Sequence, residues 1–140
     1  MCWFGKKEPL NPPAPRVRFH ILTQENDCFK LSGLPEGTHI RQVVDTNSML
    51  PVFDTKFELI VSPVQHLSDL IVGDIIVYHR PAMIINKQWV GDGYICHRII
   101  EIKEKNGKWV CKCQGDNSPK PDPYDVEASW EIQVVRGMVW

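Results

Sequence analysis

Short runs of β-branched and aromatic residues recur along the chain, and glycine, proline and asparagine separate them. Runs of this length bounded by turn-forming residues are typical of β-strands. A short helix is expected only after Pro51 or within residues 63–70. The pattern therefore predicts a mainly β fold. The expected strands cover residues 17–22, 28–31, 38–44, 57–61, 75–79, 94–102, 109–114 and 132–139.

The strongest turn signal is Asn106-Gly107, which separates two of these expected strands. Both central residues of a two-residue hairpin turn need positive φ, and asparagine and glycine adopt it most readily. We therefore expect a β-hairpin at this point. The segments that flank the hairpin, around His97 and Asp116, would then lie near each other in space.

The first 16 residues contain four prolines. Proline lacks a backbone N–H donor and favours extended, polyproline-like structure. We interpret residues 1–16 as a Pro-rich N-terminal arm, and its tip, Cys2-Trp3-Phe4, as a possible docking segment for a partner. Because 140 residues are the length of one domain, residues 17–140 are expected to form a single β domain.

Charge and composition exclude several classes of function. With 16 basic and 17 acidic residues the net charge is -1, so we expect no nucleic-acid partner. We also expect no transmembrane anchor and no signal peptide, because the apolar runs are short and the first residues are charged. Five cysteines, an odd number, favour a reducing compartment. The expected protein is soluble and cytoplasmic or virus-associated.

Four motifs follow one another from the middle of the chain onward. They contain a serine, a histidine and aspartates, the components of a nucleophilic hydrolase. Their order and apolar flanks resemble the type I signal peptidase superfamily, which includes the self-cleaving LexA-type repressors. The motifs are Ser48-Met49-Leu50-Pro51, Gly73-Asp74-Ile75-Ile76-Val77, His97-Arg98-Ile99-Ile100 and Gly115-Asp116-Asn117.

The resemblance covers residues 41–139 and implies a signal peptidase catalytic core, a compact coiled sheet or β-barrel-like structure with little helix. His97-Arg98 is similar to the archaeal and endoplasmic-reticulum branch, whereas bacterial signal peptidases and LexA-type repressors carry Lys-Arg there. Lys87, a rival base, lacks matching neighbours and is interpreted as a surface residue. The chain looks similar to the soluble, stand-alone relatives found in phages and mobile elements.

The resemblance also implies the main catalytic roles. Ser48 would be the nucleophile and His97 the base, since an imidazole accepts a proton near neutral pH with little tuning. In the histidine-type members, aspartates at the fourth motif and shortly after it orient the histidine. This selects Asp116 and Asp122, and Asp125 stays open as the alternative to Asp122.

Further roles concern the residues around the nucleophile. The backbone amide of Ser48 would bind the oxyanion with help from Thr46, which is equally well read as an ordinary strand residue. Val44 and Met49 are expected to contact the substrate. Asn47 stands where the family often has glycine, and Asp74 is interpreted as a turn residue.

The sequence thus predicts a serine endopeptidase resembling signal peptidase I, which cleaves an extended segment of a protein or peptide substrate. Cleavage in trans is favoured, because the Ala-Gly and Cys-Gly dipeptides cut by LexA-type proteins are absent from the sequence. We expect no cofactor and no metal, since Cys96, His97, Cys111 and Cys113 include no Cys-x-x-Cys pair. The alternative is a catalytically inactive peptidase-fold module with a structural or interaction role in a phage or virion.

Overall fold

The computed structural model describes residues 21–25, 28–42, 47–53 and 57–139, so the predicted N-terminal arm lies outside it. The described residues form β-strands and one short 3-10 helix, and no α-helix occurs among them, which confirms the mainly β prediction. The elements are β1 (Ile21–Glu25), β2 (Cys28–Ser32), β3 (His39–Gln42), β4 (Glu58–Pro63), η1 (Leu67–Asp69), β5 (Ile75–Arg80), β6 (Met83–Ile85), β7 (Gln88–Val90), β8 (Gly93–Lys105), β9 (Lys108–Gln114), β10 (Val126–Glu127) and β11 (Ile132–Val139).

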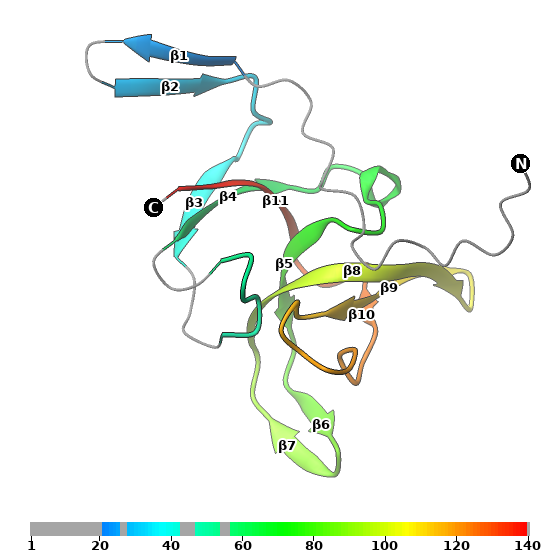
Figure 1. Cartoon of the computed structure of the whole chain (residues 1–140). Helices are drawn as coiled ribbons and strands as arrows, with labels where there is room; N and C mark the ends of the chain where they lie inside the picture. The colour runs from blue at the N-terminus through cyan, green and yellow to red at the C-terminus, as the bar shows by residue number, and fades with distance from the viewer. Residues whose placement is uncertain (1–20, 26–27, 43–46, 54–56, 140) are drawn as a thin grey trace, which may run out of the picture.

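Seven strands form one antiparallel sheet in the order β10-β9-β8-β5-β11-β4-β3 (Figure 1). Its two edges are the short strands β10 and β3, and no pairing joins them among the described residues. The sheet is therefore open, and the barrel-like closure that we expected is not formed by the described strands. Strands β5 and β8 lie inside this sheet, so each has a neighbouring strand on both sides.

Two small hairpins project from the large sheet, β1–β2 and β6–β7 (Figure 1). The second occupies residues 83–90, where the sequence pattern predicted no strand. Its strands are joined by Asn86 and Lys87, both with positive φ, which is the geometry of a tight hairpin turn. The sequence signal was weak because lysine is not a typical residue at such a position.

The hydrophobic core has two parts, which lie on opposite faces of strand β5. Ile76 and Tyr78 belong to the first cluster, and Ile75 and Val77 belong to the second. Alternate residues of a strand point to opposite faces, so β5 is covered on both sides. This explains why the strand begins with a continuous apolar run, Ile75-Ile76-Val77-Tyr78, rather than with an alternating pattern.

The β8–β9 hairpin confirms the turn predicted at Asn106-Gly107, whose φ angles are 52° and 72°. In the neighbouring ladder His97 pairs with Ile76 of β5. Directly paired residues share one face of a sheet, so His97 lies on the face of the first core cluster. Arg98, the next residue, points to the other face. This alternation separates Asp122 from Asp116, although the resemblance assigned both aspartates to His97.

Candidate active site

Ser48 lies in a compact turn that follows Asn47. The amides of Val52 and Phe53 donate hydrogen bonds to the carbonyl of Met49 at 2.9 and 3.3 Å. The side chains of Met49 and Phe53 are 3% and 2% exposed and pack in the second core cluster. The turn is thus anchored just after the serine, while Ser48 itself is only partly buried.

The hydroxyl of Ser48 lies within hydrogen-bond distance of His97. Ser48 Oγ and His97 Nε2 are 3.1 Å apart, although 49 residues separate them in the sequence. His97 lies in β8, where it pairs with Ile76 of β5, and the ladder with β9 begins at the next residue, Arg98. The sheet therefore holds the backbone of His97. This is the distance expected between a nucleophile and its general base.

The other ring nitrogen of His97 contacts the carboxylate of Asp122. Nδ1 lies 2.8 Å from Oδ2 and 3.0 Å from Oδ1 of Asp122. The two side chains are 13% and 9% exposed. In a neutral imidazole, Nδ1–H donates to the carboxylate, and Nε2 then presents its lone pair to the serine hydroxyl. The arrangement therefore selects the tautomer that a general base needs.

Asp122 stands in the proline-rich segment that follows β9. Its amide donates a hydrogen bond to the carbonyl of Cys113 at 2.8 Å, which ties the segment to the sheet. Pro121 and Pro123 flank it, and each ring fixes φ near -65°. The prolines restrict the backbone on both sides of Asp122 and so help to hold its carboxylate in place.

A tyrosine pair lies behind Asp122, and the sequence did not indicate it. The hydroxyl of Tyr78 donates to Asp122 Oδ2 at 2.9 Å and lies 3.2 Å from the hydroxyl of Tyr124. Tyr78 is fully buried, and burial raises the pKa of its phenol well above the ordinary value. The group therefore stays protonated and remains a donor. The only sequence signal was a hydroxyl directly after the apolar run Ile75-Ile76-Val77.

The Gly115-Asp116-Asn117 motif contacts the serine turn through backbone amides and through the side-chain amide of Asn117. The amide of Asn117 donates to the carbonyl of Ser48 at 2.8 Å, and the Asn117 side chain donates to the carbonyl of Asn47 at 3.1 Å. The amide of Asp116 contacts Met49 Sδ at 3.5 Å. These contacts position Ser48 relative to β9 and hence relative to the neighbouring strand β8.

Gly115 is the point of closest approach between the serine turn and the histidine. A Cβ atom on Gly115 would lie 2.6 Å from the Ser48 carbonyl oxygen and 2.9 Å from His97 Nε2. Both distances are shorter than real Cβ contacts allow. Only glycine therefore fits here without moving Ser48 away from His97.

The carboxylate of Asp116 does not contact His97 but forms an ion pair with Arg98. Its two oxygens accept from Nε and Nη2 of Arg98 at 2.8 and 2.7 Å. This hydrogen bonding to Asp116 raises the pKa of the Arg98 guanidinium. Our expectation that Asp116 orients the histidine is thus not met by the geometry. The reason is the strand alternation, which directs Arg98 and His97 to opposite faces of β8.

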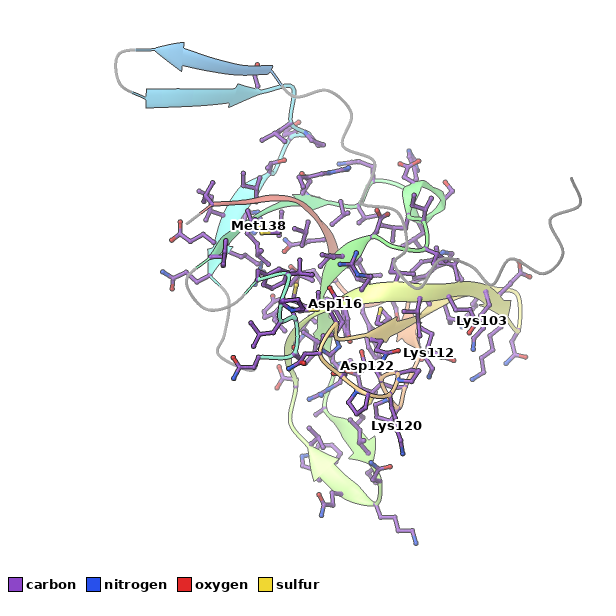
Figure 2. The ribbon with its side chains drawn as sticks, viewed as in Figure 1. Lys103, Lys112, Asp116, Lys120, Asp122 and Met138 are labelled. Atoms are coloured by element: carbon purple, nitrogen blue, oxygen red, sulfur yellow. The ribbon has the colours of Figure 1, made fainter. Side chains whose placement is uncertain are left out.

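Asp125, the alternative to Asp122, lies among lysines. Its oxygens are 3.6, 3.7 and 3.2 Å from the ammonium groups of Lys103, Lys105 and Lys112. Burial opposes ionisation, but the hydrogen bond and charge of Lys112, with the other two lysines, lower the pKa of Asp125. Figure 2 shows Lys103 and Lys112 beside the long hairpin, with Asp122 in the loop beyond it. Of these two aspartates, the structure brings Asp122 to His97.

Of the other predicted site residues, the structure describes some and not others. Thr46 and Val44 lie outside the described residues, so the oxyanion role of Thr46 and the substrate contact of Val44 stay predictions. The oxyanion role of the Ser48 amide also stays a prediction. Met49, expected to contact the substrate, is buried beneath the serine turn. Lys87 lies in the exposed β6–β7 turn.

Two further groups are placed by the structure. Asp74 is buried and accepts a hydrogen bond from the amide of Ile71 at 2.9 Å, as a turn residue does. The sulfur atoms of Cys111 and Cys113 are 3.8 Å apart in the first core cluster. Across the described ranges, no group of three or more histidine, cysteine or acidic side chains could hold a metal ion.

Comparisons of the chain with protein-family models, curated proteins and solved structures find no match. Within residues 21–139, leaving aside the gaps in the description, no helix has the length and apolar character needed to cross a membrane. The functional argument therefore rests on the site itself, where Ser48, His97 and Asp122 form one continuous chain of contacts.

Proposed function

We propose that the protein is a serine endopeptidase in which Ser48 is the nucleophile, His97 the general base and Asp122 the orienting carboxylate. The observation that carries this proposal is the pair of contacts on one imidazole ring. Ser48 Oγ lies 3.1 Å from Nε2, and Asp122 Oδ2 lies 2.8 Å from Nδ1. A nucleophile, a base and an orienting group in this order support acyl transfer to a serine.

The reaction follows from this arrangement. As Ser48 Oγ attacks the scissile carbonyl carbon, its proton passes to His97 Nε2, and Asp122 stabilises the resulting imidazolium. His97 then gives this proton to the departing amine as the C–N bond breaks, which leaves an acyl-serine. A water molecule attacks the ester, its proton passes to His97, and Ser48 recovers a proton as the acid product leaves.

The substrate is proposed from the resemblance to signal peptidases. An extended protein or peptide segment would pair with backbone near Ser48, with small side chains next to the scissile bond. Such binding is sequence-tolerant, because main-chain hydrogen bonds supply much of it. We propose action in trans, on a separate chain, with no cofactor.

Peptide cleavage and active-site labelling together test this proposal. The intact chain would be incubated with a library of small-residue peptides, and separately with a fluorophosphonate probe that esterifies activated serines. We expect cleavage, and a probe adduct on Ser48, both lost in Ser48→Ala and His97→Ala. The rate should fall at acidic pH, where a histidine base becomes protonated.

Matched controls separate chemistry from folding. Ser68→Ala and His66→Ala change the same residue types in and beside η1, where both residues are exposed. These variants should cleave and label as the parent does. A folded parent that neither cleaves any peptide nor takes up the probe would overturn the proposal and favour the alternative, a catalytically inactive peptidase-fold module.

A further inference from the structure

Tyr78 is a buried polar group that the proposed mechanism does not use. It is fully buried at the middle of β5, and its ring packs against Trp130 and Tyr124 with centroid separations of 5.9 and 6.4 Å. This packing holds the ring in place. Its hydroxyl contacts the carboxylate of Asp122 and the hydroxyl of Tyr124.

The oxygen atom of Asp122 that accepts from Tyr78 is also the one closest to the His97 ring. The Tyr78 hydroxyl donates to Asp122 Oδ2 at 2.9 Å, and the same oxygen lies 2.8 Å from His97 Nδ1. A buried hydroxyl that needed only an acceptor could use any carbonyl. Here it shares the acceptor of the catalytic histidine, so it affects both the orientation of the carboxylate and the negative charge that faces the ring.

Tyr124 extends this network by one step. A tyrosine hydroxyl has a single proton, and that of Tyr78 is directed to Asp122, so the hydrogen bond between the two hydroxyls must be donated by Tyr124. Accepting a hydrogen bond makes the Tyr78 hydroxyl a better donor to the carboxylate. The order of donation is therefore Tyr124 to Tyr78 to Asp122.

We propose that Tyr78 is a positioning residue that holds the Asp122 carboxylate against His97 and limits its strength as an acceptor. This inference rests on the proposed serine peptidase function. Without the Tyr78 hydroxyl, the carboxylate would rotate more freely, and more of its negative charge would face the imidazole. The first effect slows the reaction, and the second stabilises the protonated histidine.

The groups that face the Asp122 carboxylate come from three strands and one loop. They are His97 from β8, Tyr78 from β5, Cys113 from β9 and Tyr124 from the loop after β9. Tyr78, Cys113 and Tyr124 have raised pKa values and stay neutral near pH 7. Two fixed positive charges lie beside Tyr124. The Arg80 guanidinium is 5.8 Å from its ring centre, and the Lys112 ammonium donates to its carbonyl at 3.1 Å.

The test compares Tyr78→Phe with Tyr94→Phe. Tyr94 is half exposed, and its hydroxyl donates to Glu131 at 3.1 Å, away from the catalytic groups. For Tyr78→Phe we expect a fall of about tenfold in kcat with little change in KM, the size of a single lost transition-state hydrogen bond. The acid limb of its pH profile should move to higher pH, while Tyr94→Phe should match the parent.

A measurement that needs no turnover keeps this inference separate from the proposed function. NMR titration of the His97 ring, assigned with His97→Ala, gives its protonation midpoint in each variant. The midpoint should rise in Tyr78→Phe and less so in Tyr124→Phe, which keeps the contact with Asp122. An unchanged midpoint in a folded Tyr78→Phe protein, or in Tyr124→Phe if Tyr78→Phe fails to fold, would overturn the inference. If the midpoint rises in Tyr78→Phe as predicted but the parent cleaves nothing, the peptidase proposal alone is overturned.

Discussion

Asp122 Oδ2 lies 2.8 Å from Nδ1 of His97, although the two residues are 25 positions apart in the chain. The contact depends on two separate features. Strand β9 returns beside β8, and the amide of Asp122 is then tied to the carbonyl of Cys113 on β9. Asp116 comes six residues earlier yet contacts Arg98. The two aspartates therefore provide a matched pair of sites for mutagenesis.

Asp122→Asn should remove most of the activity. An asparagine at this position can donate its amide to Nδ1, which favours the imidazole tautomer with a proton on Nε2 and no lone pair for the serine. The expected loss in kcat is on the order of 10³- to 10⁴-fold. Steady-state cleavage of a peptide from the library measures it.

Asp116→Asn is the control for that experiment. It weakens the ion pair with Arg98 without touching the imidazole. We expect a stability loss of about 1 kcal/mol in urea denaturation and a much smaller effect on kcat. If Asp116→Asn reduced kcat as much as Asp122→Asn, the assignment of Asp122 as the orienting carboxylate would fail.

Gly115→Ala should misplace the nucleophile. The added methyl group would lie 2.6 Å from the Ser48 carbonyl oxygen and 2.9 Å from His97 Nε2, so the serine turn has to shift. A displacement of about 1 Å between reacting groups can reduce the rate about 100-fold. We expect a loss of that size in kcat/KM, together with about 1 to 3 kcal/mol of stability from overpacking.

Gly91→Ala is the matched glycine control. No heavy atom lies within 4 Å of a Cβ built at Gly91, so the substitution meets open space. Its activity and its denaturation midpoint should stay close to those of the parent. Full activity in Gly115→Ala would show that the approach of Ser48 to His97 tolerates a side chain, contrary to the geometry.

The sequence carried much of the fold because the relevant signals are local. The strand runs and the Asn106-Gly107 turn depend on residue types within a few positions, and they correspond to β-strands and a hairpin in the structure. The β6–β7 hairpin was missed for the same reason, since Asn86-Lys87 is a weak turn signal. Whether the sheet closes depends on pairing between distant strands, which no local signal reports.

The sequence indicated several residues of the site, but not which of them contact one another. Ser48 and His97 stand in motifs, and their contact agrees with the roles expected for them. The partner of Asp116 could not be read from the motif, because it depends on which face of β8 each residue occupies. Tyr78 was missed because its role depends on the return of the proline-rich segment over β5.

Asp74 should make the stability depend on pH. Burial raises the pKa of this carboxyl, although the hydrogen bond from Ile71 and the charge of Arg136 act in the opposite direction. A folded-state pKa above the unfolded value stabilises the protein at low pH, and this contribution is lost as the pH rises through the folded-state pKa. Ionisation of Asp74 therefore lowers the free energy of unfolding.

The measurement compares the parent with Asp74→Asn in denaturant at several pH values from about 4 to 7. Asparagine keeps an oxygen that can accept from the Ile71 amide but does not titrate. The difference in free energy of unfolding should change in favour of Asp74→Asn as the pH increases. A difference that stayed constant, or moved in favour of the parent, would contradict the assignment of a raised pKa.

Asn47, which stands before Ser48 where glycine was expected, has a backbone conformation that suits both residues. Its φ is 54°, in the left-handed region where glycine is favoured and asparagine is the best tolerated of the other residues. The glycine expected from the resemblance to signal peptidases and the asparagine found here both suit this backbone conformation. Asn47→Gly should keep both stability and activity, whereas Asn47→Ala should lower stability by about 1 kcal/mol and also lower activity.

Asn86→Ala separates the two effects of the Asn47 substitution. Asn86 has nearly the same φ, 51°, but lies in the β6–β7 turn. Alanine there should lower stability by a similar amount, because the backbone penalty is the same, and should leave kcat/KM unchanged. Denaturation and peptide cleavage measured on all three variants decide the point. Equal loss of activity in Asn86→Ala and Asn47→Ala would mean that the loss reflects stability alone. A loss confined to Asn47→Ala would mean that the positive φ of Asn47 positions Ser48 relative to His97.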